Sequence, residues 1–175
     1  SGGRGYHAHV RTPDVMELGT HERRELVDYI TGTGLDINWV FPYNRVATSK
    51  VVTGSGMRTN VAKDRLIPPA DAGGWKKRMR RGLMDVVNDF CDGDGKELKR
   101  EYPSIKGSDI KTVYKAQEEL KKARTVLFDK NNMAMLSTAT QNMLVKIMKE
   151  DVAYRLSGEV DEPVTADIKR LIRLP

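Results

Sequence analysis

The sequence contains one cysteine, no long apolar run and none of the common catalytic motifs. Because Cys91 is alone, no disulfide can form within the chain, which suits a reducing compartment. No apolar stretch approaches the roughly 20 residues that a membrane-spanning helix needs, and the mean hydropathy is −0.53. These absences predict an intracellular protein without a membrane-embedded part.

Motifs for nucleotide or metal binding are also missing. The run Gly54-Ser55-Gly56-Met57-Arg58-Thr59 lacks the lysine that a phosphate-binding loop requires. Asp92-Gly93-Asp94-Gly95 lacks the third acid and the closing glutamate of a calcium loop, and indicates an acidic turn. His7, His9 and His21 have no cysteine partners at metal-ligand spacing. We therefore predict no metal, no cofactor and no enzymatic activity.

The length of 175 residues suits one ordinary domain with its own core. We interpret Ser1-Gly2-Gly3 as residues added for expression, and residues 1–11 as a flexible N-terminal segment. The remaining residues, 12–175, are predicted to form a single helical domain.

Apolar spacings of three and four residues predict most of the fold as helix. The clearest stripe runs from Trp75 to Cys91, and others cover 108–128 and 133–156. Shorter helices are expected after Thr12 and Thr20, and Thr165 is expected to cap a terminal helix. The methionines of the 133–148 stretch lie at core-like spacing, and Cys91 is expected to be buried. The predicted fold class is mainly α, a compact domain of five to six helices with a small β-hairpin near residues 37–53.

The expected hairpin pairs two apolar runs across a short turn. Residues 37–41, rich in β-branched and aromatic types, predict its first strand, and 46–52 predict the second. Pro42-Tyr43-Asn44 is typical of the turn between them. From Gly54 to Gly74 the glycines and prolines indicate a long loop.

Positive charge is concentrated in the middle of the chain. Residues 1–41 hold four arginines against six acids, whereas 42–91 hold ten lysines and arginines against four aspartates. Residues 96–130 hold ten bases against six acids, and 131–175 are balanced. Such asymmetry indicates an anionic partner, with a lysine-rich solvated surface as the ordinary alternative.

The strongest anomaly is the run Lys76-Lys77-Arg78-Met79-Arg80-Arg81. It occupies the first turns of the expected Trp75–Cys91 helix, whereas Asp85, Asp89 and Asp92 lie toward its end. A helix favours the opposite arrangement by about 0.3–1 kcal/mol per charge. An external polyanion would neutralise these cations, and free amides at the helix start also approach phosphates well. A nuclear localisation signal is the alternative interpretation.

These observations predict DNA or RNA binding, with duplex DNA favoured. Other basic residues in the expected hairpin, loop and 108–128 helix support this interpretation. The predicted nucleic-acid-binding residues are Arg45, Lys50, Arg58, Lys63, Arg65, Lys76, Lys77, Arg78, Arg80, Arg81, Lys111 and Lys115.

The run from Trp39 to Gly54, in which an apolar-Phe stretch leads through a polar segment to Thr53-Gly54, resembles part of the BEN domain family. Leu66-Ile67-Pro68 followed by the Leu83–Cys91 helix resembles the Leu-x-Pro element and helix of that family. The resemblance covers roughly residues 22–125. It implies a small helical module of DNA and chromatin factors, and hence a nuclear role in transcription regulation.

Two further interpretations stay open. The chain would also suit a protein-interaction or oligomerisation module, such as a viral structural or polymerase-cofactor domain. In that case the Met133–Met148 helix would form a homo-oligomer face or contact a protein partner. The third interpretation is an accessory domain of a larger enzyme whose activity lies elsewhere.

Overall fold

The computed structural model describes residues 12–53, 56–158, 160 and 165. It divides into two compact units. The first combines residues 1–34 with residues 157–175, and the second is Leu35–Leu156. The predicted N-terminal segment 1–11 lies outside the described residues, and the division of the chain into domains stays a prediction.

The first unit contains the short helix α1 (Pro13–Met16) and the longer helix α2 (Thr20–Thr31). The Arg23 side chain ties them together, since it donates from Nε to the Leu18 carbonyl at 2.9 Å and from Nη2 to the Val15 carbonyl at 3.0 Å. Gly32, at φ 71°, ends α2 in the left-handed conformation that glycine tolerates. The predicted helix after Thr165 lies outside the described residues.

The second unit opens with helix α3 (Ile37–Val40), where the sequence predicted a strand. That prediction was wrong because two signals outweigh strand propensity here. The Asp36 carboxylate accepts a hydrogen bond from the Asn38 amide at 2.8 Å and caps the helix. Val40 and Phe41 are buried in the core, so the segment is held by packing against other helices.

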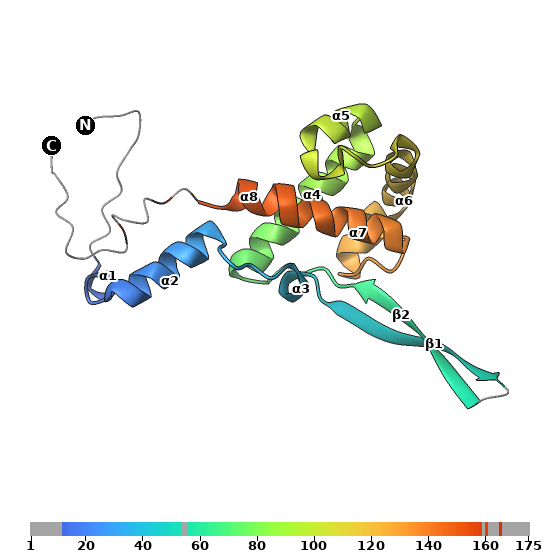
Figure 1. The fold of residues 1–175 in the computed structure, drawn as a ribbon, viewed down its shortest axis with the longest axis horizontal. Helices are drawn as coiled ribbons and strands as arrows, with labels where there is room; N and C mark the ends of the chain where they lie inside the picture. Colours follow the sequence, from blue (N-terminus) through green and yellow to red (C-terminus); the bar gives the residue numbers. More distant parts are fainter. Residues whose placement is uncertain (1–11, 54–55, 159, 161–164, 166–175) are drawn as a thin grey trace. The chain divides into compact units, whose positions relative to one another are not determined.

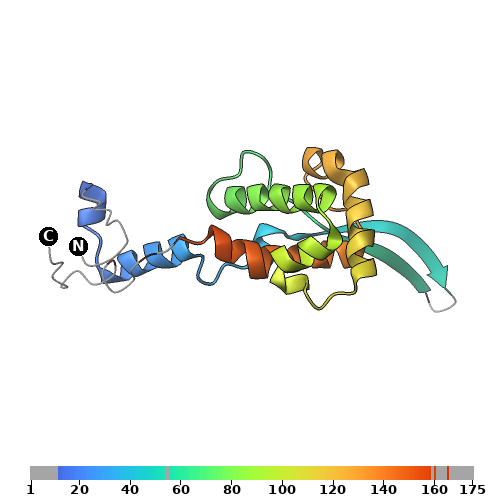
Figure 2. The same ribbon diagram turned by 90° about the horizontal axis from the view of Figure 1, so that it is seen from above.

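A two-stranded antiparallel ribbon follows, made of β1 (Tyr43–Thr53) and β2 (Gly56–Arg65). It projects away from the helices of this unit in both ribbon views (Figures 1 and 2). The predicted hairpin therefore exists, but both strands lie later in the sequence than expected. The long loop predicted to begin at Gly54 was wrong for 56–65, which form β2.

Helix α4 (Gly74–Asp92) is the centre of this unit and matches the predicted Trp75–Cys91 stripe. It packs against α6 (Ile110–Asp129) and against the continuous segment formed by η2 (Met148–Val152) and α8 (Ala153–Leu156). Its Gly82 permits the second contact, since an added Cβ would lie 2.5 Å from Cγ1 of Val152. η2 is a π-helical turn, a geometry found mostly as single-turn insertions in α-helices.

Helix α7 (Thr138–Ile147) precedes η2, so the predicted 133–156 helix begins about five residues late. The Ser137 Oγ accepts from the Thr140 amide and caps it. Met143 and Met148 are buried, as their spacing predicted, and so is Cys91. Met133 is buried as well, so three methionines of this stretch fill the core as predicted, whereas Met135 is 57% exposed.

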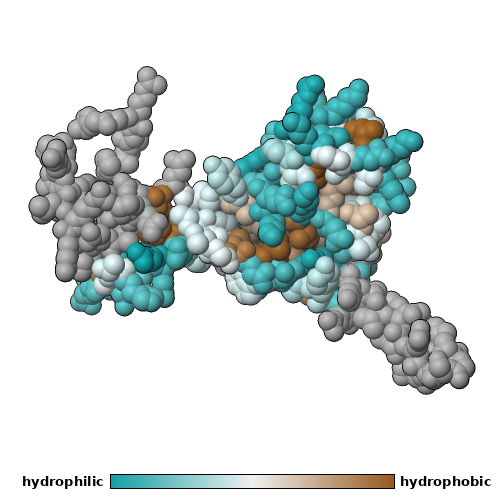
Figure 3. Space-filling model, viewed as in Figure 1, coloured by the Kyte–Doolittle hydropathy of each residue, from teal (hydrophilic) through white to brown (hydrophobic). Residues whose placement is uncertain are grey.

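Two short elements were not predicted: α5 (Gly95–Glu101) and the 3₁₀ turn η1 (Pro103–Ile105). They lie between α4 and α6, and the Asp94 carboxylate caps α5 by accepting from the Lys96 amide at 3.1 Å. The fold-class prediction, mainly α with a small two-stranded sheet, is confirmed. Hydrophilic residues cover much of the visible face of the helices (Figure 3). No helix in the described residues is long and apolar enough to cross a membrane.

Candidate nucleic-acid interface

Arg65 lies at the base of the ribbon and is only 6% exposed. Its Nη1 donates to the Asn38 Oδ1 and to the Phe41 carbonyl, each at 2.8 Å, and its Nη2 donates to the Tyr43 hydroxyl at 2.8 Å. The guanidinium also stacks 3.7 Å from the centre of the Tyr43 ring. Arg65 was predicted to contact nucleic acid, but its burial and bonds make it the residue that fastens α3 to β1.

No carboxylate in the described part of the chain forms an ion pair with Arg65, and its Nε has no hydrogen-bond partner there. Neutral oxygens satisfy the hydrogen bonds of a buried cation but do not cancel its charge, so its positive electrostatic potential remains. The base of the ribbon is therefore electropositive.

Two aromatic rings of the segment that runs from α3 into β1 are exposed. Trp39 is 53% exposed and Tyr43 is 47% exposed. The Lys76 Nζ lies 4.4 Å from the centre of the Trp39 ring, within cation–π distance. Exposed aromatic rings beside cations are the elements with which proteins bind single-stranded nucleic acid, because bases stack on the rings and phosphates contact the cations. Sequence reasoning missed Trp39 as a site residue, because it assigned this residue to a strand.

The predicted cations of α4 divide into two kinds. Lys77, Arg78 and Arg81 are exposed. Arg80 is instead held inside the fold. Its Nη1 donates to the Pro68 carbonyl and the Asn131 Oδ1, and its Nη2 donates to the Phe128 carbonyl.

Because these bonds occupy the Arg80 guanidinium, we do not include Arg80 among the proposed phosphate contacts. Within the described residues, no carboxylate forms an ion pair with Lys76, Lys77, Arg78 or Arg81.

The ribbon carries four further predicted cations, whose backbone positions follow from its register. Arg45 pairs with Lys63, Lys50 pairs with Thr59, and Arg58 pairs with Val51. A β-bulge interrupts the register between Ala47 and Ser49.

Lys111 and Lys115 lie elsewhere. Helices α4 and α6 run antiparallel: Arg80 bonds to Phe128 at one end, and the Gln117 side chain donates to the Phe90 carbonyl toward the other. The two lysines are exposed near the start of α6, and thus at the opposite end of this helix pair from Lys77. The structure does not bring them to the other predicted residues.

This region of the molecule combines exposed aromatic rings with exposed cations. Comparison with known proteins adds the family. The family model of the DNA primase small subunit matches residues 1–175. The chain belongs to the DNA primase small subunit family.

Curated relatives agree with this assignment. The chain is 36% identical over 176 residues to the DNA primase small subunit of Methanococcoides burtonii, covering all of this chain and 43% of that protein. It is 37% identical over 187 residues to that of Methanocella arvoryzae, covering all of this chain and 44% of the relative. The chain thus spans less than half the length of these relatives. No solved structure matches.

Family membership corrects several predictions. The BEN resemblance was wrong, because its ordered motifs were too short and too loosely spaced to identify a family. The predicted non-catalytic DNA-binding domain was wrong, and the alternative of an interaction or oligomerisation module fits no better. The prediction that the chain is no enzyme was wrong as well, since primases are enzymes. The nuclear, transcriptional and viral assignments find no support, because these relatives are archaeal.

Proposed function

We propose that this chain is part of the catalytic subunit of a DNA primase, and that its described residues bind the nucleic acid on which primers are made. We name the binding region the cation–aromatic surface. It comprises Trp39, Tyr43, Lys76, Lys77, Arg78 and Arg81.

The observation that carries the proposal is the contact of Trp39 with Lys76, beside cations that form no ion pair with any carboxylate of the described residues. An enzyme that copies a DNA strand must hold the phosphodiester backbone without selecting a sequence. Stacking on aromatic rings and contacts to phosphates are both tolerant of sequence. The surface therefore matches the demand that a priming reaction places on its template.

Primer synthesis joins nucleotides by attack of a hydroxyl on a phosphate, and metal ions commonly stabilise the attacking and leaving oxygens. No group of three or more His, Cys, Asp or Glu residues that could hold a metal ion occurs among the described residues. We therefore assign no bond-making step to them. Their role in the proposal is to bind the polynucleotide and to orient it.

The proposal is tested with the full-length protein in a primer-synthesis assay on single-stranded DNA with nucleoside triphosphates. The variant Lys77→Gln/Arg78→Gln/Arg81→Gln removes three exposed cations. It also removes the contact of Arg78 with the buried Trp75 ring, whose centre lies 5.3 Å from the guanidinium carbon, so the thermal unfolding midpoint is measured alongside. We expect the KM for template to rise at least about tenfold with kcat little changed. The slope of log affinity against log salt should fall by about two, because each lost phosphate contact on a single strand is worth about 0.7.

The matched control is Lys121→Gln/Lys122→Gln/Lys149→Gln, which removes three exposed cations from other surfaces and gives the same net charge. We expect its KM to stay within about threefold of wild type. Equal losses in both triple variants would show that total charge matters and the surface does not. A full-length protein that neither makes primers nor binds polynucleotide contradicts the proposed function itself.

A further inference from the structure

The short helix α5 carries charges of both signs on its exposed sides. Lys99 and Arg100 lie three and four residues after Lys96, and Glu101 lies four residues after Glu97, so each set gathers toward one side. Leu98 is 3% exposed and anchors the third side in the core. Two grooves adjoin the helix, one mainly acidic in its charges and one basic, and Arg100 lines both.

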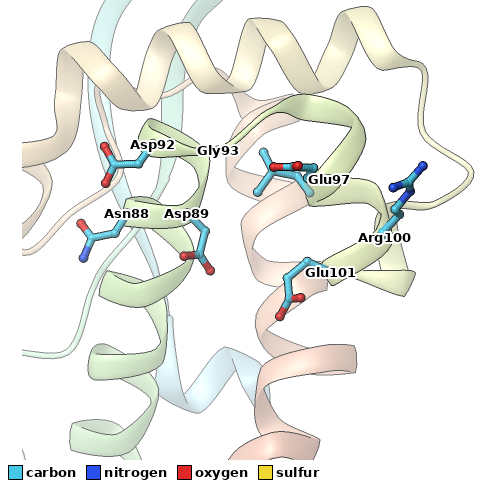
Figure 4. A pocket seen from close by; sticks show the side chains of 8 residues that line it. Asn88, Asp89, Asp92, Gly93, Glu97, Arg100 and Glu101 are labelled. Atoms are coloured by element: carbon cyan, nitrogen blue, oxygen red, sulfur yellow. The ribbon is translucent and has the colours of Figure 1, made fainter.

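Most acids of the acidic groove have partners in the fold. The groove measures about 680 Å³, and its four acids come from α4 and α5 (Figure 4). The Asp92 Oδ1 lies 3.5 Å from Nη1 of Arg124, and the Glu101 Oε1 lies 2.8 Å from Nη1 of Arg155. The Tyr102 hydroxyl donates to Asp89 at 2.5 Å. Three of the four acids therefore have a partner in the fold.

The charged residues of the basic groove, by contrast, form no ion pairs within the described residues. It measures about 700 Å³, and its cations come from α5 and from the turn before α6. Its lining comprises Lys96, Lys99, Arg100, Pro103, Lys106 and Ile110. No carboxylate in the described residues forms an ion pair with any of these four cations. Arg100 projects on the far side of α5 from Asp89 and Asp92 (Figure 4).

One cation of this groove is fixed by the fold. The Lys99 Nζ donates to the Ser108 carbonyl at 2.7 Å, which holds the half-buried ammonium in place and leaves two of its three donors for another acceptor. Pro103 and Ile110 give the groove an apolar wall. Tyr114 follows Ile110 by one helical turn and is 42% exposed. An added Cβ on Gly95 would lie 2.7 Å from its ring, so this glycine lets the ring lie against α5.

We propose that this groove binds the phosphodiester backbone of single-stranded nucleic acid, as a second contact separate from the cation–aromatic surface. Cations that pair with no carboxylate of the described residues supply the affinity for phosphates. The apolar wall, and the exposed Tyr114 ring one turn beyond Ile110, supply contacts for bases. Such contacts favour an unpaired strand, because its bases are free to stack on an aromatic ring. Lys111 and Lys115, exposed at the same end of α6, extend the positive field around it.

This inference rests on the proposed function, because it assumes that the protein binds a nucleic-acid strand. The groove lies at the α5 end of the α4–α6 pair, whereas Lys77 and Trp39 lie toward the other end. A strand that reaches both contacts would be held at two places. The second contact is therefore expected to matter more for long strands than for short ones.

The test uses fluorescence anisotropy of the full-length protein with labelled oligo-dT of about 8 and about 30 nucleotides. The variant Lys96→Gln/Arg100→Gln/Lys106→Gln neutralises three groove cations, all exposed, and leaves the Lys99 bond intact. The control is again Lys121→Gln/Lys122→Gln/Lys149→Gln. We expect the groove variant to lose at least about tenfold in affinity for the long strand, with a salt slope lower by about two. The control should lose less than about threefold, and both should keep the thermal unfolding midpoint of wild type.

Other results overturn the inference. Unchanged affinity of the groove variant for the long strand, with normal binding by wild type, overturns the groove alone. An equal loss of affinity for blunt duplex DNA means that the site does not select a single strand. Competition by poly-glutamate, with no effect of the variant on oligo-dT, identifies an acidic peptide as the ligand instead. A wild-type protein that binds no polynucleotide overturns the proposed function and this inference together.

Discussion

The two ends of helix α4 carry opposite charges, and both oppose the helix dipole. At the C-terminal end two acids have partners in the fold: Asp89 accepts a hydrogen bond from Tyr102, and Asp92 forms an ion pair with Arg124. At the N-terminal end Arg80 donates to neutral oxygens, and Lys76 and Arg78 lie over the Trp39 and Trp75 rings. No carboxylate in the described part of the chain forms an ion pair with these cations or with Arg81. The acids at the C-terminal end are therefore used within the fold, whereas exposed cations at the N-terminal end can bind an external anion.

The sharpest test within the N-terminal end compares two neighbouring arginines. Arg80→Ala removes charged hydrogen bonds to three partners and is expected to lower the free energy of unfolding by about 3 kcal/mol. Arg81→Ala should change it by no more than about 0.5 kcal/mol. Urea unfolding followed by circular dichroism measures both. Similar values for the two variants would remove the distinction between structural and available cations.

At the C-terminal end, Tyr102→Phe removes the hydrogen bond to Asp89. Tyr102 is 1% exposed, and the lost bond to a carboxylate should cost about 2 kcal/mol at neutral pH. Burial, together with the hydrogen bond to Asp89, raises the pKa of Tyr102 well above its ordinary value of 10.

The sign of the pH effect follows from that raised pKa. Above pH 10 the unfolded chain loses the Tyr102 proton before the folded chain does, so wild type loses stability as the pH rises further. The Tyr102→Phe variant lacks this group, and the difference between the two proteins should shrink between pH 10 and higher values. Urea unfolding at several alkaline pH values measures it, and a constant difference would contradict the assigned role.

A smaller effect on stability than that of Arg80→Ala or Tyr102→Phe is expected from Lys77→Glu, which separates stability from binding. Replacing a cation by an acid in the first turn of α4 relieves the dipole and should raise the free energy of unfolding by about 0.5–1 kcal/mol. The same change places a negative charge on the cation–aromatic surface and should weaken polynucleotide binding at least about tenfold. Stability and affinity must therefore move in opposite directions, and a variant that binds as wild type does would place the nucleic acid elsewhere.

Much of the helical fold could be predicted because its signals are local. The buried residues of α4 recur every three or four positions, and this spacing alone located the helix to within about a residue. The short α3 and α5 were missed because each depends on an aspartate cap and on packing against distant helices. The ribbon was misplaced because β-propensity reports how well a residue fits its surroundings more than any local preference.

The candidate site was harder to predict than the fold. Sequence reasoning marked Arg65 and Arg80 together with their neighbours because all are cations in a basic region. Arg65 donates to the carbonyl of Phe41, which lies 24 residues away in the sequence. Arg80 donates to the carbonyl of Phe128, which lies 48 residues away. Trp39 and the groove cations were missed because exposure and counter-ions are properties of the packed chain.

The sequence by itself determined that the chain is mainly helical and that its cations cluster in the middle, because apolar period and charge order are written along the chain. The tertiary structure decided which of those cations are available. It placed Arg65 and Arg80 among carbonyl and side-chain oxygens and left Lys77, Arg78 and Arg81 exposed. The physical reason is that a charge is neutralised by whatever surrounds it in space, and residues far apart in the sequence supply those surroundings.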